Sequence, residues 1–88
     1  MGLFMVERYL VGWSEAEVQA LVRRTGELAG VFETAGVRHV GSVYIPIDET
    51  CLCLFEAADA ARVSAVNERC ALPFGRVVAG ELMAVLAQ

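Results

Sequence analysis

The stretch "VRHVGSVYIPIDETCLCLFEA", residues 37–57, determines the fold that we expect for this chain. Its first part is β-branched and partly alternating, "DET" is typical of a turn, and "CLCLFEA" is a second apolar run. Two such runs around a short polar loop predict a β-hairpin. Pro46, near the end of the first run, predicts an edge strand because proline cannot donate a hydrogen bond to a neighbouring strand.

A helical pattern lies on either side of this hairpin. Before it, Ser14 and Glu17 have the spacing of a capping box, so we expect a helix that begins here and ends near Gly36. The role of both residues is then capping and not catalysis. After the hairpin, Asp59 is the expected N-cap of a second helix, which ends before Pro73. The apolar residues expected on the inner faces of the two helices are Val18, Leu21, Val22, Leu28, Ala29, Phe32, Val63, Val66 and Cys70.

Two glycines interrupt the first helical pattern. Gly26 and Gly30 each cost on the order of 1 kcal/mol relative to alanine in a helix. Because they are four residues apart, they share one face of the helix. Close packing against another backbone explains them, and so does plain local weakness of the helix.

Short apolar runs at residues 3–10 and 76–86 complete the order β-α-β-β-α-β, which is typical of the ferredoxin-like fold. We therefore expect one α+β domain over residues 1–88, in which a four-stranded antiparallel sheet carries both helices on one face. Right-handed crossovers lead us to expect the first and third strands as a parallel pair at the sheet centre. The open face is apolar, so we expect two copies to close it as a dimeric α+β barrel.

The composition excludes several classes of protein. The chain is 57% hydrophobic with a net charge of -4, and it has no basic patch, which argues against nucleic acid as a partner. No apolar stretch approaches the roughly 18 residues of a membrane span. Glu7 and Arg8 come too early for a signal peptide. Three cysteines cannot all pair, so we expect free thiols and a cytoplasmic location.

Cys51 and Cys53 lie on one face of the expected third strand, with Cα atoms about 6.6 Å apart. Their parallel Cβ directions make a mutual disulfide geometrically poor. Both are simply explained as small apolar residues in the core. A metal-ligand role and a redox role remain as alternatives.

Polar residues on the first two strands are the other candidates for a site. Glu7 and Arg8 are adjacent, so one of them points to the open face; a carboxylate there is expensive unless it is paired or bound to something. His39 is the only histidine and is either a ligand, a proton-transfer group or simply hydrogen-bonded. Tyr9 and Tyr44 line one shared cavity or only pack.

The second helix carries a polar run near its end. Asn67, Glu68 and Arg69 follow one another there, and we expect them to form a solvated face of that helix.

Three segments together resemble a known family: "FMVERYLVG", "VGSVYIPIDETCLCLFEA" and "NERCALPFGRVV". The resemblance is to a small ferredoxin-like domain family of unknown function whose members are often named nickel-binding proteins, and it extends from Leu3 to about Leu82. It implies a dimer and binding of a divalent transition metal such as nickel. Its most specific pieces are Val6-Glu7-Arg8, Ser42, Cys53, Pro73 and Arg76-Val77.

Three functions are compatible with these features. The one we favour is a non-catalytic homodimer that holds a metal or small ligand between two sheets. Mixed nitrogen, oxygen and sulfur ligands suit nickel, zinc or copper. The expected metal ligands are Glu7, His39 and Cys53, and the expected ligand-binding residues are Tyr9, Tyr44 and Cys51.

The other two functions use the same fold differently. One is a dimeric α+β-barrel enzyme of the cyclase, isomerase or monooxygenase type, in which Glu7 or His39 acts with Tyr44 in acid–base chemistry. The other is a structural interaction protein whose apolar face only makes a dimer.

Overall fold

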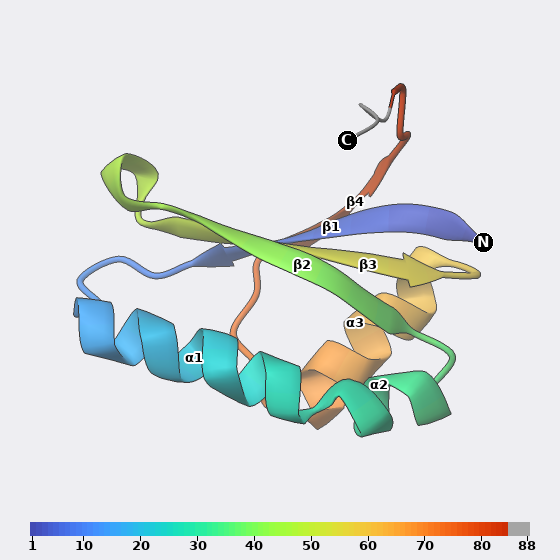
Figure 1. Cartoon of the computed structure of the whole chain (residues 1–88), viewed down its shortest axis with the longest axis horizontal. Helices are drawn as coiled ribbons and strands as arrows, with labels where there is room; N and C mark the ends of the chain where they lie inside the picture. Colours follow the sequence, from blue (N-terminus) through green and yellow to red (C-terminus); the bar gives the residue numbers. More distant parts are fainter. Residues whose placement is uncertain (85–88) are drawn as a thin grey trace.

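A sheet of four strands with helices on one face makes up the part of the chain that the computed structural model describes, residues 1–84 (Figure 1). The order across the sheet is β2-β3-β1-β4, and all neighbouring strands are antiparallel. This confirms the α+β, ferredoxin-like architecture. The elements are β1 (Gly2–Tyr9), α1 (Glu15–Glu27), α2 (Ala29–Thr34), β2 (Arg38–Ile45), the short 3-10 turn η1 (Pro46–Asp48), β3 (Thr50–Ala57), α3 (Ala60–Arg69) and β4 (Arg76–Gly80).

The central pair differs from our expectation. β1 and β3 lie side by side, but they are antiparallel, so the expected parallel pair is wrong. The reason is that the helical crossovers join β1 to β2 and β3 to β4. The two strands of each of these pairs are parallel, but a third strand lies between them in the sheet. β4 also ends earlier than expected, at Gly80; residues 85 and 86 of the expected strand lie outside the described residues. Pro46 directly follows β2, which is an edge strand as predicted.

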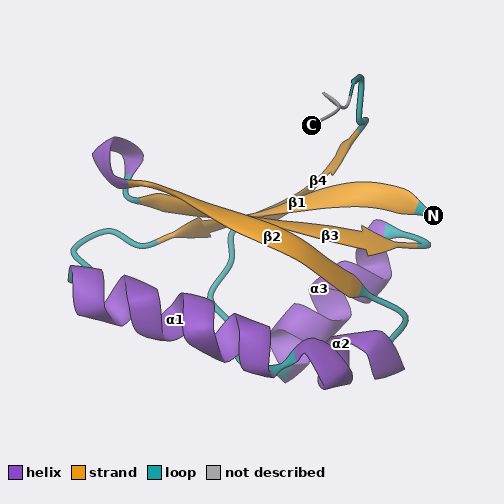
Figure 2. Cartoon of the chain, in the orientation of Figure 1, coloured by secondary structure: helices purple, strands orange, loops and turns teal. Residues whose placement is uncertain are grey.

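The helical layer lies below the sheet in Figure 2. Its helices α1 and α3 begin directly after the predicted N-caps, Ser14 and Asp59. Ser14 and Glu17 form the capping box: each side chain accepts a hydrogen bond from the other residue's backbone N–H, at 3.2 and 2.9 Å. The first helix is divided at Leu28. A methyl group added at Gly26 or Gly30 would meet nothing within 4 Å, so local weakness and not close packing explains these glycines. None of the helices in residues 1–84 has the length and apolar character needed to cross a membrane.

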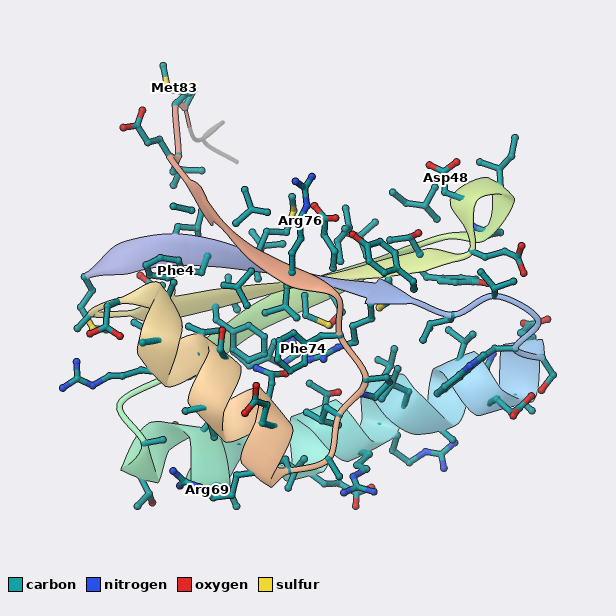
Figure 3. All side chains as sticks on the ribbon, turned by 180° about the vertical axis from the view of Figure 1, so that it is seen from behind. Phe4, Asp48, Arg69, Phe74, Arg76 and Met83 are labelled. Carbon is teal, nitrogen blue, oxygen red and sulfur yellow. The ribbon has the colours of Figure 1, made fainter. Side chains whose placement is uncertain are left out.

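Strand alternation gives the sheet two different faces. Phe4, Val6 and Arg8 of β1 are buried against the helices, whereas Leu3, Met5 and Glu7 point the other way and are half-buried. In Figure 3, Arg76 projects from the face away from the helices, and Phe74 lies on the helix side. The buried core between sheet and helices consists of Phe4, Val6, Leu10, Val18, Leu21, Phe32, Val37, Cys51, Cys53, Phe55, Ala57, Val63, Val66 and Leu72.

Candidate functional site

A fully buried arginine is the centre of the helix-side core. Arg8 is 0% exposed, and its side chain ends in a guanidinium cation with five N–H donors. Its guanidinium donates to the side-chain oxygen of Asn67 (2.7 Å), the backbone oxygen of Pro73 (3.0 Å) and the sulfur of Cys53 (3.2 Å). Within residues 1–84 no carboxylate forms an ion pair with Arg8. The only acidic group among its three partners is therefore the Cys53 thiol.

The surroundings of Cys53 favour its thiolate. A hydrogen bond from the Cys51 thiol, with sulfurs 4.0 Å apart, is the largest cause that lowers the pKa of Cys53, and His39, the charge of Arg8 and the Ser42 hydroxyl at 3.1 Å lower it further. Together they outweigh burial and bring the pKa from the ordinary 9.0 to about 3. The same hydrogen bond and burial raise the pKa of Cys51. We call Arg8 and Cys53, together with the residues hydrogen-bonded to them, the Arg8–Cys53 site; these residues are Ser42, Cys51, Asn67 and Pro73.

The end of α3 supplies the rest of this site. The Asn67 side chain donates to the backbone oxygen of Val63 (2.8 Å) while its own oxygen accepts from Arg8, so both ends of the amide are satisfied. Leu72 donates its backbone N–H to the backbone oxygen of Asn67 (3.0 Å), so the chain after α3 folds back against the last turn of this helix. Asn67 is 0% exposed as a result, and the expected solvated position is wrong for this residue.

The edge strand contributes a hydroxyl and an imidazole. Ser42 of β2 donates to Cys53, and the Nε2 atom of His39 lies 3.0 Å from the Ser42 oxygen. The imidazole ring packs 5.1 Å from the ring of Phe55, centroid to centroid. His39 is therefore held by Ser42 and the Phe55 ring, and from this position it also lowers the pKa of Cys53.

A second polar cluster lies on the open face. Glu7 accepts hydrogen bonds on one carboxylate oxygen from the Tyr9 hydroxyl (2.5 Å) and from Arg76 (2.9 Å), and its side chain is only 14% exposed. The hydrogen bond from Arg76, and then that from Tyr9, lowers the pKa of Glu7. A Cβ at Gly75 would clash with the Tyr9 ring, so a glycine is needed here for the ring to lie where it does.

The family of the chain follows from its sequence match. The family model described as nickel responsive protein SCO4226-like matches residues 4–79. The chain belongs to this family. The crystal structure of SCO4226 from Streptomyces coelicolor A3(2) has a TM-score of 0.73 with it at 23% identity, covering 93% of this chain and 99% of that chain. At this identity the likeness shows the fold. No curated protein matches the chain.

The family resemblance named residues that the structure brings together. Arg8, Ser42, Cys53 and Pro73 meet in the Arg8–Cys53 site, and Glu7 and Arg76 meet on the open face. Asn67 also belongs to the Arg8–Cys53 site, although we expected it on a solvated face of the second helix. Its position four residues after Val63, on the inner stripe of the helix, was the signal that it points inward.

The residues expected to bind a metal do not meet in one chain. Glu7 is on the open face, whereas His39 and Cys53 are on the helix side of the sheet. Tyr9 is on the open face and Tyr44 beside Cys51 on the helix side, so the two tyrosines share no cavity. The described residues contain no group of three His, Cys, Asp or Glu side chains that can hold a metal ion.

Residues 1–84 of a single chain therefore contain no set of donors that fits the nickel of the family name. The Cys53 sulfur already contacts a cation at 3.2 Å, and a second cation on that sulfur would be repelled by the guanidinium. Three pockets on residues 1–84, one of them of about 460 Å³ between α1 and Tyr44, have no lining residue among Glu7, His39 and Cys53.

Replacement of Cys53 tests whether it balances the charge of Arg8. We expect Cys53→Ala to lower the free energy of unfolding by about 3–5 kcal/mol, because it leaves a buried cation without its counter-charge. Cys51→Ala is the comparison variant, since this thiol is equally buried on the same face of β3 but is not hydrogen-bonded to Arg8, and its loss leaves the Cys53 sulfur in place; it should cost clearly less. Equal losses in urea unfolding of the two variants would show that Cys53 is only a packing residue.

The stability should also depend on pH through Cys53. Its pKa is lower in the folded protein, about 3, than the ordinary 9.0 of an unfolded chain, so the unfolded state binds more protons between these values. The stabilisation is complete above the unfolded pKa and is lost progressively as the pH falls toward the folded one. Urea unfolding of the wild type and Cys53→Ala across this range should give a difference in stability that shrinks toward acid. A difference that does not change with pH would contradict a Cys53 thiolate.

Proposed function

We propose that this protein is a small, cytoplasmic, nickel-responsive binding protein that works as a homodimer, with two copies paired through the open faces of their sheets. The family description supports the relation to nickel. The free thiols of Cys51, Cys53 and Cys70 suit the reducing cytoplasm.

The observation that carries the dimer is the apolar character of the open face. Its side chains are half-buried or exposed and lie on the sheet side without helices. A contiguous apolar surface of this kind usually marks an interface. The apolar residues on it are Leu3, Met5, Val43, Ile45, Leu52, Leu54 and Val78.

The charges on this face favour an identical copy as the partner. Glu7 pairs with Arg76, and Glu56 pairs with Arg38, so each acidic group of these two pairs already has a basic neighbour. In a two-fold interface the same surface meets itself, and a face with unpaired charge of one sign would repel its copy. Two internally balanced ion pairs avoid that repulsion.

Nickel binding would then depend on donors from two copies. Glu7 lies on the face that pairing would bring together. Arg76 and Tyr9 both bind its Oε1 atom, so the Oε2 atom is the donor that dimerisation doubles in the interface. Oxygen donors of this kind, with nitrogen donors or water, are acceptable ligands for divalent nickel. His39 and Cys53, on the far side of each sheet, take no part in such a site.

A charge placed in the open face tests the dimer. We expect the wild type to sediment as a dimer at micromolar concentration and Val43→Glu to sediment as a monomer, because a carboxylate would be buried against the partner. Val31→Glu is the matched control: Val31 is 43% exposed on α2, compared with 54% for Val43, and should leave the dimer intact. A monomeric wild type in analytical ultracentrifugation would remove this proposal.

Titration with nickel chloride tests the metal. We expect tag-free wild-type protein to bind nickel in isothermal titration calorimetry and Glu7→Gln to bind it at least about tenfold more weakly, because a charged donor is lost. Glu27→Gln on the exposed face of α1 is the control and should bind as the wild type does. Weaker binding in His39→Ala instead would place the metal on the helix side, and no binding by the wild type would exclude the metal altogether.

A further inference from the structure

The helix side of the sheet holds a nucleophile that the proposed function does not use. The Cys53 sulfur has the Arg8 guanidinium at 3.2 Å, the Ser42 hydroxyl at 3.1 Å and the Cys51 sulfur at 4.0 Å. Charge balance assigns its state, because Arg8 is fully buried and Cys53 is the only acidic group hydrogen-bonded to it within the described chain. The thiolate is the reactive form of cysteine toward electrophiles.

We propose that Cys53 and Cys51 form a hydroperoxide-sensitive thiol pair, and that oxidation of Cys53 removes the counter-charge of Arg8 and loosens the fold. This inference is independent of the dimer and of nickel. It uses the Arg8–Cys53 site on the opposite side of the sheet from the open face.

The path to Cys53 leads through the edge of the sheet. Cys53 is 1% exposed, but the side chain that covers it there, Ser42, is only half-buried and belongs to the edge strand β2. β2 has a register shift between His39 and Gly41, directly before Ser42, and pairs with β3 alone. A small displacement of this strand therefore admits a molecule of the size of hydrogen peroxide.

The first step is a two-electron oxidation of sulfur. The Cys53 thiolate attacks the terminal oxygen of the hydroperoxide, an S–O bond forms and the O–O bond breaks. The sulfur loses two electrons, the peroxide gains them, and the leaving hydroxide or alkoxide takes one proton from water. The product is a sulfenic acid on Cys53, and the negative charge opposite Arg8 is lost when this group becomes a disulfide in the second step.

The second step involves the neighbouring thiol. Cys51, which keeps its proton, attacks the sulfenic sulfur of Cys53; the S–O bond breaks, an S–S bond forms and the departing oxygen takes the thiol proton to leave as water. The sulfurs must close from 4.0 Å to a bond on one face of a single strand, which is poor disulfide geometry. Oxidation therefore distorts β3 and at the same time leaves the buried Arg8 without an anion.

The test uses the wild-type chain and hydrogen peroxide, with Cys70 as an internal control. Cys70 is half-buried and so more accessible than Cys53. The Arg24 guanidinium donates to its backbone oxygen at 2.7 Å, but no hydrogen bond within the described residues reaches its sulfur. We expect peptide mass spectrometry after peroxide treatment to show Cys53 oxidised about tenfold faster than Cys70, with Cys51 and Cys53 joined and two hydrogens lost. The oxidised protein should unfold at lower urea, and dithiothreitol should restore the original midpoint.

A variant separates the two steps. In Cys51→Ser, the disulfide cannot form, and dimedone should trap a sulfenic acid on Cys53. Faster oxidation of Cys70 than of Cys53, or an unchanged urea midpoint after complete oxidation of Cys53, would overturn the proposal.

Discussion

The buried positive charge of Arg8 is the constraint on which the helix side of this domain depends. A guanidinium removed from water is costly unless its charge and its N–H groups are satisfied. Here its three hydrogen bonds go to β3, to α3 and to the loop before β4. Because these segments are 45, 59 and 65 residues away in sequence, one side chain fixes their relative positions. The Cys53 thiolate is the only anion within that set, so the order of this part of the core depends on the protonation and redox state of one sulfur.

Two adjacent charged residues of β1 lie in different environments, because the side chains of a strand alternate between the two faces of the sheet. Arg8 points into the core and donates a hydrogen bond to the Cys53 thiolate. Glu7, one residue before it, points to the open face and accepts hydrogen bonds from an arginine and a tyrosine. The partners of both come from the end of the chain as well: Pro73 for Arg8, and Arg76 for Glu7. The segment from Pro73 to Arg76 thus satisfies opposite charges on opposite faces of the same strand. Gly75 in its middle has no side chain, and this lets the Tyr9 ring lie against the backbone.

The sequence was sufficient for the order of the elements and for their starts. Helix starts follow from local chemistry, and the Ser14–Glu17 capping box and the Asp59 cap are local interactions within three residues. The same holds for the hairpin around Pro46. The direction of the central strand pair was predicted wrongly because it depends on how distant segments connect, and the position of Asn67 was predicted wrongly because three polar residues in a row suggested a solvated face. The partners of Arg8 were beyond local reasoning, since a backbone oxygen such as that of Pro73 carries no signal in the sequence.

The expected ligand set shows most clearly why residue types alone did not define a site. Glu7, His39 and Cys53 are chemically suitable donors for nickel, but a strand assigns successive side chains to opposite faces, and only the register between strands determines which residues share one. In this sheet Val6 lies opposite Cys53, which puts Glu7 on the other face from the thiolate. The Cys53 thiolate is also the counter-charge of the Arg8 guanidinium, which repels a second cation from the sulfur. In the proposed function a nickel ion therefore approaches from the open face, where Glu7 lies on the central strand β1 and where a second copy would supply further donors.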